Sequence, residues 1–523
     1  MLTSSIQPYF IFSLLHILLA LNTLTAEASQ TPFCNHFGSH LESFEQGMNL
    51  LAKDRKDANV NPEMYGYRFP QVPLDVEGYP IAPEGLALKQ VHVYVRHGER
   101  TPVGVRMTNA PANIPEHWNM CRTASRFRSA VHDTLSGHKT SQPAAMGSDE
   151  TLATRIAVER GDGNVVEGEC LLGELTDLGR QTTFAFGKNL RNLYVNRLGF
   201  IPDKLSDTNQ VYFRTTNIPR TTQSLQQIVR GLYPDEKCHE NVHPPLLVRN
   251  GKDENLIGNT YTCKRLEILQ VSFAKAAAEA YNHTLERLDS KLSKYIDGNP
   301  IRVDGKPRAS GVMDTIRAAI AHGIQVPPEF EDKSIVNTIE KAVVTEWFSG
   351  VYILGFMLLK AHTSFTGYKT EEVRRLGMGR LLSDVSTKME KKIQKGDSDP
   401  LKILVHSTHD TAIAALCSTL DVFDEQWPAF TASITFELFE KADVNENPRQ
   451  SQSILSRLGS SPHSEHFVRM RYQNKDMALP ICADKGKHLE GHPEFCTFEA
   501  FKSRVKELTP TDWDMECSPA GRP

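Results

Sequence analysis

The stretch LKQVHVYVRHGERTP, residues 88–102, decides the fold. It begins with a run that alternates in polarity and is rich in β-branched side chains, a pattern typical of a buried strand. Arg96, His97 and Arg100 follow at once, in a turn that also contains glycine. The sequence therefore predicts a strand over Leu88–Val95 that carries two arginines and a histidine at its carboxyl end.

Length and composition are those of a globular protein. The chain has 523 residues, of which 40% are hydrophobic and 23% charged, which excludes disordered and fibrous classes. The net charge is -4 and the pI about 6.6, whereas a broad nucleic-acid-binding face needs a basic surface. We therefore expect no nucleic-acid partner, and we expect any strong positive charge to be local.

The N-terminus has the pattern of a secretory signal peptide. The apolar run at residues 10–21 is too short for a membrane-spanning helix of about 20 residues, and the small residues Ala26–Ala28 follow as a cleavage site. No arginine precedes this run, which disfavours a mitochondrial presequence. Residues 1–28 are therefore predicted to direct the chain to the secretory pathway, as a secreted, vacuolar, lysosomal or cell-surface protein without a membrane span after their removal.

The cysteines fit that compartment. Nine cysteines suit an oxidising environment, but an odd count leaves at least one thiol without a partner in this chain. Spacing alone does not settle the pairing; Cys121 and Cys170 are candidates by proximity, and three more stay open: Cys34, Cys238 and Cys417. No C-x-x-C pair is present, so we expect no metal site of that kind. Asn282 begins the sequon N-H-T and is predicted to carry a glycan on a surface loop.

Strand and helix patterns alternate along the chain. Further strands are expected at Gln210–Phe213, Lys402–Val405, 432–440 and 466–473. Helices are expected at 177–197, after Pro219 and at Asp410–Leu420. This alternation predicts an α/β fold with a mixed central sheet flanked by helices on both faces.

The domain organisation is read from changes in composition. Residues 29–87 are rich in proline, glycine and polar side chains and are predicted to be an extended arm. The main domain is expected to span 88–523, with an irregular insertion at 104–172 and a smaller, mostly α-helical cap subdomain at about 262–335. Residues 333–362 also have a helical pattern.

Three predicted strands end in residues whose side chains can bind a ligand or react with it. In an open α/β sheet, ligands bind outside the carboxyl ends of the strands, so these ends can face one pocket. The three ends supply two sets of side chains: the arginines Arg96, Arg100 and Arg214, and the pair His409 and Asp410. Arginine forks match phosphate oxygens with paired, charge-assisted hydrogen bonds. The predicted ligand is therefore a phosphoryl group.

The other polar residues fit phosphoryl transfer. One histidine can attack phosphorus and form a covalent intermediate, while the other donates a hydrogen bond to a phosphate oxygen. Asp410, when protonated in the complex, can protonate the leaving alkoxide and later take a proton from the attacking water. The arginines would stabilise the charge on the equatorial oxygens. This chemistry needs no metal and no cofactor.

Simpler readings exist for each residue taken alone. A histidine after a strand is often structural, the arginines could be solvated, and His409-Asp410 could be a helix cap. Glu99 is expected at the surface or facing the substrate. The pattern R-H-G-x-R-x-P, however, arises by chance in only roughly one chain of this length in 10,000. The conjunction with a distant H-D therefore favours a functional site.

These motifs resemble those of the histidine acid phosphatases. The resemblance extends from about Lys89 to Cys517 and includes the motif L-T-x-x-G at Leu175–Gly179. It implies the histidine phosphatase fold and a metal-independent acid phosphatase. It further implies these roles: His97 as the phosphoryl acceptor, Asp410 as the proton donor, and Arg96, Arg100, Arg214 and His409 as ligands of the substrate phosphate.

Within that family, two stretches look most like the lysophosphatidic acid phosphatase branch, also called acid phosphatase type 6. They are FRTTNIPRT at 213–221 and LDVFDEQWPAFTASITFELF at 420–439. The likeness implies a small phosphomonoester or lysophospholipid substrate, although animal members of that branch are mitochondrial. It also implies the disulfides Cys263–Cys517 and Cys482–Cys496. Dimers are common in the family, so a homodimer is possible.

Three alternatives remain open at this point. A phytase or inositol polyphosphate phosphatase would need extra lysines and arginines around the pocket, which the mild net charge does not demand. A phosphate-binding surface protein without catalysis would need the arginines but neither His97 nor Asp410. A phosphoglycerate mutase-like isomerase would serve cytosolic metabolism, which the signal peptide disfavours.

Overall fold

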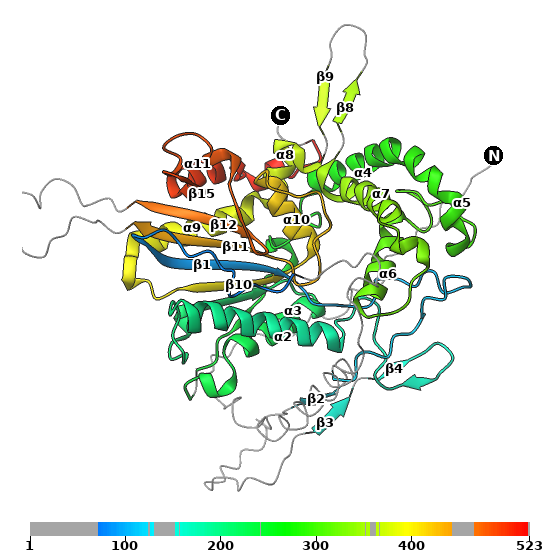
Figure 1. Cartoon of the computed structure of the whole chain (residues 1–523), viewed down its shortest axis with the longest axis horizontal. Coiled ribbons are helices and arrows are strands. Elements are labelled where there is room, and N and C mark those ends of the chain that lie inside the picture. The colour runs from blue at the N-terminus through cyan, green and yellow to red at the C-terminus, as the bar shows by residue number, and fades with distance from the viewer. Residues whose placement is uncertain are drawn as a thin grey trace, which may run out of the picture. The chain divides into compact units, whose positions relative to one another are not determined.

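The computed structural model describes most of the chain: residues 72–123, 126–129, 152–155, 157–240, 242–350, 352–355, 362–365, 367–441 and 465–520. These residues include a nine-stranded sheet in the order β14-β15-β12-β11-β1-β10-β6-β7, with β13 beside β12 (Figure 1). Its strands are β1 (Leu86–Arg96), β6 (Val211–Thr215), β7 (Leu246–Leu247), β10 (Ile403–Thr408), β11 (Ser433–Lys441), β12 (His466–Tyr472), β13 (Lys475–Met477), β14 (His488–Leu489) and β15 (His492–Thr497).

The sheet is mixed, as predicted. Strand β10 runs parallel to both β1 and β6, and in this register Ser407 lies between Val95 and Thr215. Strand β11 runs antiparallel to β1 on its other side. The three parallel strands therefore end together, and the residues that follow them meet at their carboxyl ends.

Helices cover both faces of the sheet (Figure 1). One face of β1 carries Val91, Val93 and Val95, which share a core with α2 (Asp177–Arg191) and α3 (Pro219–Leu232). The alternate residue Tyr94 belongs to a second core on the opposite face. Three helices contribute to that second core: α9 (Arg380–Lys395), α10 (Asp410–Thr419) and α11 (Phe498–Leu508). The α/β fold class is confirmed.

A mostly helical region has a core of its own. It consists of α4 (Lys264–Leu285), α5 (Asp289–Leu292), α6 (Ala309–Ala321) and α7 (Lys333–Val344), followed by a π-helical turn, Thr345–Ser349. Its buried apolar residues, such as Ile316 and Ile339, pack with Ile114 and Trp118 from the segment after the first turn. We call α4–α7 and this turn the helical region. Its helices run beyond residue 335, the expected limit of the cap.

The expected helix over 333–362 is wrong in its second half. Gly350 has φ 67°, a left-handed conformation that ends the helical path. Beyond it, β8 (Tyr352–Gly355) and β9 (His362–Phe365) form an antiparallel hairpin. The apolar pattern of this sequence is ambiguous, because a short apolar run fits a buried helix and a strand equally well.

The sequon at Asn282 lies in α4, so the predicted surface loop is wrong, whereas the glycan itself stays a prediction. Its carboxamide oxygen accepts a hydrogen bond from the backbone N–H of Val303 at 2.9 Å. Its Nδ2 donates to Asp304 Oδ1 at 2.8 Å. The carboxamide oxygen and nitrogen of Asn282 thus hold residues 303 and 304 against the helix.

The segment between the first turn and α2 contains two short antiparallel pairs. They are β2 (Arg126–Ser129) with β3 (Leu152–Arg155), and β4 (Val158–Glu159) with β5 (Val165–Val166). At its N-terminal end the described chain is packed rather than free, since Leu74 and Tyr79 are buried in the core beside α2. The predicted signal peptide, most of the arm and Cys34 lie outside the described residues. Within the described part, no helix has the length and apolarity needed to cross a membrane.

Candidate active site

Two glycines bring the turn after β1 against the start of α2. A Cβ atom at Gly98 would lie 2.3 Å from the carbonyl oxygen of Gly179, and one at Gly179 would lie 2.1 Å from the carbonyl oxygen of Glu99. No larger residue fits at either position. Thr176 caps α2 by accepting from the Gly179 N–H at 3.2 Å, and its own N–H donates to the Glu99 carbonyl oxygen. The motifs R-H-G-x-R-x-P and L-T-x-x-G are thus the two halves of one contact.

Arg96 and Asp410 form a buried ion pair at the carboxyl ends of β1 and β10. Arg96 Nη2 lies 2.6 Å from Asp410 Oδ2, while Nη1 donates to the Pro428 carbonyl oxygen at 2.7 Å. The Arg96 guanidinium also lies 4.2 Å from the centre of the Phe430 ring. Burial favours the neutral acid, but Arg96, Arg100 and His409 together lower the pKa of Asp410 below its ordinary value.

The ring of His97 is held in one tautomer. Its Nδ1 lies 2.8 Å from the carbonyl oxygen of Gly98. A carbonyl oxygen can only accept, so Nδ1 carries the proton and Nε2 keeps its lone pair. The side chain is 1% exposed, and burial, with help from Arg96 and Arg100, holds the pKa of His97 well below its ordinary value. Protonation of His97 is therefore disfavoured.

His409 lies next to His97 and is also neutral. The centres of the two imidazole rings are 5.6 Å apart, and His409 Nε2 shares a hydrogen bond of 3.0 Å with the Thr216 hydroxyl. Burial lowers the pKa of His409 to about 3, and Arg220 is the charged neighbour that contributes most to this. Two uncharged histidines thus face each other among arginines.

Arg100 reaches from the turn to the helical region. Its Nη2 donates to Asp314 Oδ1 on α6 at 2.8 Å, and its Nη1 donates to the Thr101 carbonyl oxygen. The other Asp314 oxygen accepts from the backbone N–H of Val103 at 2.9 Å. The helical region therefore contacts the turn directly, through a residue that the motifs do not contain.

Arg214 does not join this group. It pairs across the sheet with His406, two residues before Thr408, the partner of Arg96. Its Nη2 lies 2.6 Å from Glu254 Oε1, and its Nη1 lies 3.8 Å from Asp384 Oδ2. The sequence predicts Arg214 at a strand end, but β6 continues to Thr215, and the carboxylates of Glu254 and Asp384 lie beside the side chain.

Arg220 takes the place beside the two histidines that the sequence predicts for Arg214. It follows Pro219 in the first turn of α3, and its charge acts on His97 and His409 and adds to that of Arg100. Burial lowers the pKa of Arg220, yet no described carboxylate lies within ion-pair distance of it. The signal that could have revealed it is the helix start at Pro219, because the first turn of α3 begins beyond the end of β6.

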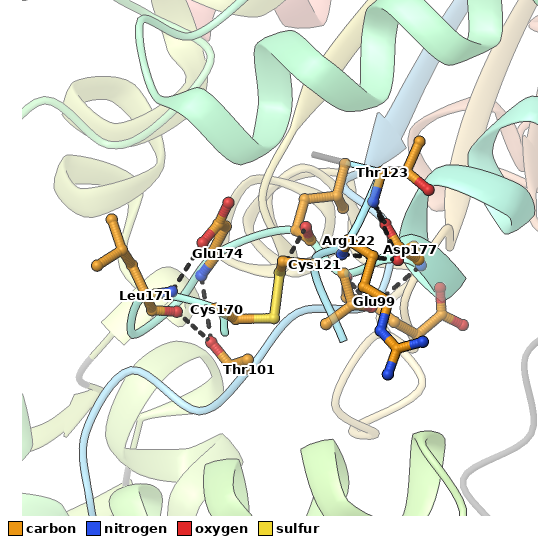
Figure 2. The surroundings of a disulfide bond; sticks show 12 residues. Glu99, Thr101, Cys121, Arg122, Thr123, Cys170, Leu171, Glu174 and Asp177 are labelled. Atoms are coloured by element: carbon orange, nitrogen blue, oxygen red, sulfur yellow. Dashed lines mark hydrogen bonds between the residues drawn. A yellow bond between two sulfur atoms is a disulfide. The ribbon is translucent and has the colours of Figure 1, made fainter. Parts of the chain in front are cut away.

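A buried disulfide lies near the turn (Figure 2). Cys121 and Cys170 are joined, and the chain after Cys170 returns to the turn, where Thr101 Oγ1 donates to the Leu171 carbonyl oxygen at 2.7 Å. Glu99 in this turn is buried rather than at the surface, and it accepts a hydrogen bond from the Thr182 hydroxyl at 2.5 Å. Glu99 therefore ties the turn to α2 and is not at the protein surface.

The other cysteines complete the framework. The structure joins Cys263 with Cys517 and Cys482 with Cys496, the two pairs implied by the resemblance. Cys417 is a buried thiol in α10, and burial raises its pKa. Cys238 Sγ lies 3.9 Å from the Tyr233 carbonyl oxygen.

An α/β sheet whose strand ends gather arginines, two neutral histidines and a buried carboxylate has the arrangement of a phosphoryl-transferring hydrolase. The model of the histidine phosphatase superfamily (branch 2) matches residues 87–473. The chain therefore belongs to this family, and it is a phosphomonoester hydrolase. The resemblance inferred from the turn is confirmed.

Several known proteins are similar along most of the chain. A probable acid phosphatase of Schizosaccharomyces pombe is 33% identical over 467 residues, which cover 84% of this chain and 95% of that protein. Human lysophosphatidic acid phosphatase type 6 is 24% identical over 444 residues, covering 83% and 86%. Among solved structures, the multiple inositol polyphosphate phosphatase of Bifidobacterium longum in complex with phosphate has a TM-score of 0.49 at 10% identity, covering 86% and 99%.

Proposed function

We propose that this protein is a metal-independent acid phosphatase that works through a phosphohistidine at His97. The observation that carries the proposal is the hydrogen bond from His97 Nδ1 to the Gly98 carbonyl oxygen, which leaves the lone pair on Nε2 beside Arg96 and Arg100. A neutral, oriented imidazole next to fixed positive charge is suited to attack an anionic phosphate ester.

The reaction has two steps. In the first, His97 Nε2 forms a bond to phosphorus, the ester P–O bond breaks, and Asp410 gives its proton to the departing alkoxide. In the second, water attacks the phosphohistidine, Asp410 takes a proton from that water, and the N–P bond breaks to release inorganic phosphate. Arg96, Arg100, Arg220 and His409 stabilise the phosphoryl oxygens throughout.

The electrostatics of the site support an acidic optimum. His97 remains neutral in acid because burial and the arginines oppose its protonation. Asp410 is ionised in the resting site because Arg96 attracts it. A bound phosphate adds negative charge and competes for Arg96, so the pKa of Asp410 rises in the complex. Nucleophile and acid are then both in their active forms below neutral pH.

The substrate class we propose is a lysophospholipid such as lysophosphatidic acid. Support comes from the relatives named lysophosphatidic acid phosphatase type 6, which align with most of this chain. For localisation we propose the secretory pathway, which the three disulfides support.

The test is phosphate release at pH 5 in the presence of EDTA, from p-nitrophenyl phosphate, lysophosphatidic acid and phytate in parallel. We expect turnover by the wild type and a loss of at least about 10⁴-fold in the rate of phosphate release in His97→Ala. When the reaction is quenched, we expect an acid-labile phosphoryl group bound to the wild-type protein alone. Wild-type activity in His97→Ala would refute the mechanism. A preference for phytate would refute the substrate assignment only.

A further inference from the structure

The two carboxyl oxygens of Asp410 accept different numbers of hydrogen bonds. Its Oδ2 accepts from Arg96 Nη2 at 2.6 Å and from the indole Nε1 of Trp427 at 3.1 Å. Its Oδ1 accepts from the backbone N–H of Thr411 at 2.8 Å. Neither a guanidinium nor an indole N–H can accept, so a proton on Oδ2 would oppose two N–H groups, whereas Oδ1 opposes one. The carboxyl group can therefore carry its transferable proton on Oδ1 at the lower cost.

Trp427 is held at this oxygen from the helical region. Its backbone N–H donates to Glu340 Oε1 on α7 at 2.9 Å, and Arg317 Nη2 on α6 donates to the same oxygen at 2.5 Å. The Arg317 guanidinium lies 5.2 Å from the centre of the Trp427 ring, and the Phe348 ring lies 5.1 Å from it. Trp427 is thus held by the hydrogen bond of its backbone N–H, by the guanidinium over the face of its ring and by an aromatic neighbour.

We propose that Trp427 is a positioning residue that fixes the Asp410 carboxyl group with Oδ1 as the oxygen that delivers the proton. The inference rests on the proposed function, in which Asp410 is the general acid, and adds to it the residue that orients this acid. It also assigns a role in catalysis to the helical region, which contacts the turn through Asp314 as well.

Two side chains donate a hydrogen bond to Asp410: Arg96 is charged, and Trp427 is neutral. The charged or titratable neighbours are Arg96 from β1, Arg100 from the turn, His409 from the start of α10 and Arg220 from α3, with Arg317, Asp314 and Glu340 behind them on the helical region. Removal of the indole N–H therefore destabilises the carboxylate of Asp410 relative to its carboxylic acid without changing any charge in the site.

The first experiment compares the pH profile of kcat for the wild type and Trp427→Phe. We expect the alkaline limb, set by loss of the Asp410 proton, to move up by about one pH unit, because a hydrogen bond to a charged group is lost. Trp347→Phe is the matched control: the Trp347 ring lies 6.1 Å from that of Trp427 in an edge-on contact, and we expect its limb to stay in place. A lower kcat with an unmoved limb in Trp427→Phe would overturn the proposal.

The second experiment needs no turnover. The carboxyl band of Asp410, identified by its loss in Asp410→Asn, is titrated by infrared difference spectroscopy, and we expect its midpoint to rise by about the same amount in Trp427→Phe. If that variant does not fold, 3-benzothienyl-alanine at position 427 keeps the bicyclic shape and replaces the N–H with sulfur. An unchanged midpoint overturns the proposal. Absence of turnover in the wild type would refute the proposed function while this titration still decides the contact.

Discussion

Arg214 and Arg220 lie six positions apart in the chain and have opposite surroundings. Arg214 is 1% exposed, within β6, and is paired with Glu254 and Asp384. Arg220 stands in the first turn of α3, where its charge adds to that of Arg100 and acts on both site histidines. The difference teaches that burial of an arginine says little about its role. These two arginines differ in their position relative to the strand ends and in their carboxylate neighbours: Glu254 and Asp384 surround Arg214, whereas no described carboxylate lies within ion-pair distance of Arg220.

Of the effects expected from this comparison, the largest is the loss of catalysis in Arg220→Ala. Because its charge is free to act on a phosphoryl group, we expect kcat/KM for p-nitrophenyl phosphate to fall by about 10²- to 10³-fold while the thermal midpoint changes little. Arg214→Ala is the matched control, and kcat/KM of its folded fraction should stay within about threefold. An equal loss of kcat/KM in the control would show that Arg214 serves the substrate after all.

The next largest effect is the loss of stability in Arg214→Ala. In Arg214→Ala, Glu254 would stay buried without its main cation, although Oε1 still accepts from the N–H groups of Asn255 and Leu256. We expect the free energy of unfolding to drop by about 3 kcal/mol, measured by urea denaturation at pH 7.

A double variant separates charge from packing at this position. Arg214→Met combined with Glu254→Gln should recover at least about half of the stability lost in Arg214→Met alone, because no unpaired charge remains. Equal instability of the single and double variants would mean that packing, not the ion pair, explains the loss.

The smallest expected effect concerns the ion pair of the site itself. Burial alone would raise the pKa of Asp410, but the attraction of Arg96 and its neighbours lowers it. The pair's stabilisation is therefore complete above the ordinary Asp pKa of about 4 and is lost as the pH falls through the lowered folded value. We expect the free energy of unfolding of Asp410→Asn, measured by urea titration, to be lower than that of the wild type by about 1–2 kcal/mol at pH 7. This difference should shrink towards pH 3. A gap that does not vary with pH would show that Asp410 is not held as a carboxylate.

Much of the fold was predictable because local patterns and tertiary packing agree. The strand before Arg96, the cap at Thr176 and the helix that starts at Asp410 all follow the alternation, capping and turn signals of the sequence. The hairpin at Tyr352–Gly355 and His362–Phe365 was missed because the same apolar run suits either structure.

The sequence by itself determined the turn at His97, the partner Asp410, the mixed sheet and the family. These depend on residues adjacent in the chain or on the rule that parallel strands end together. Only the tertiary structure decided that Arg220 rather than Arg214 faces the histidines, and that Asp314 and Trp427 reach the site from elsewhere. The physical reason is that a side chain's role depends on which charges pack around it, and those come from segments far away in the sequence.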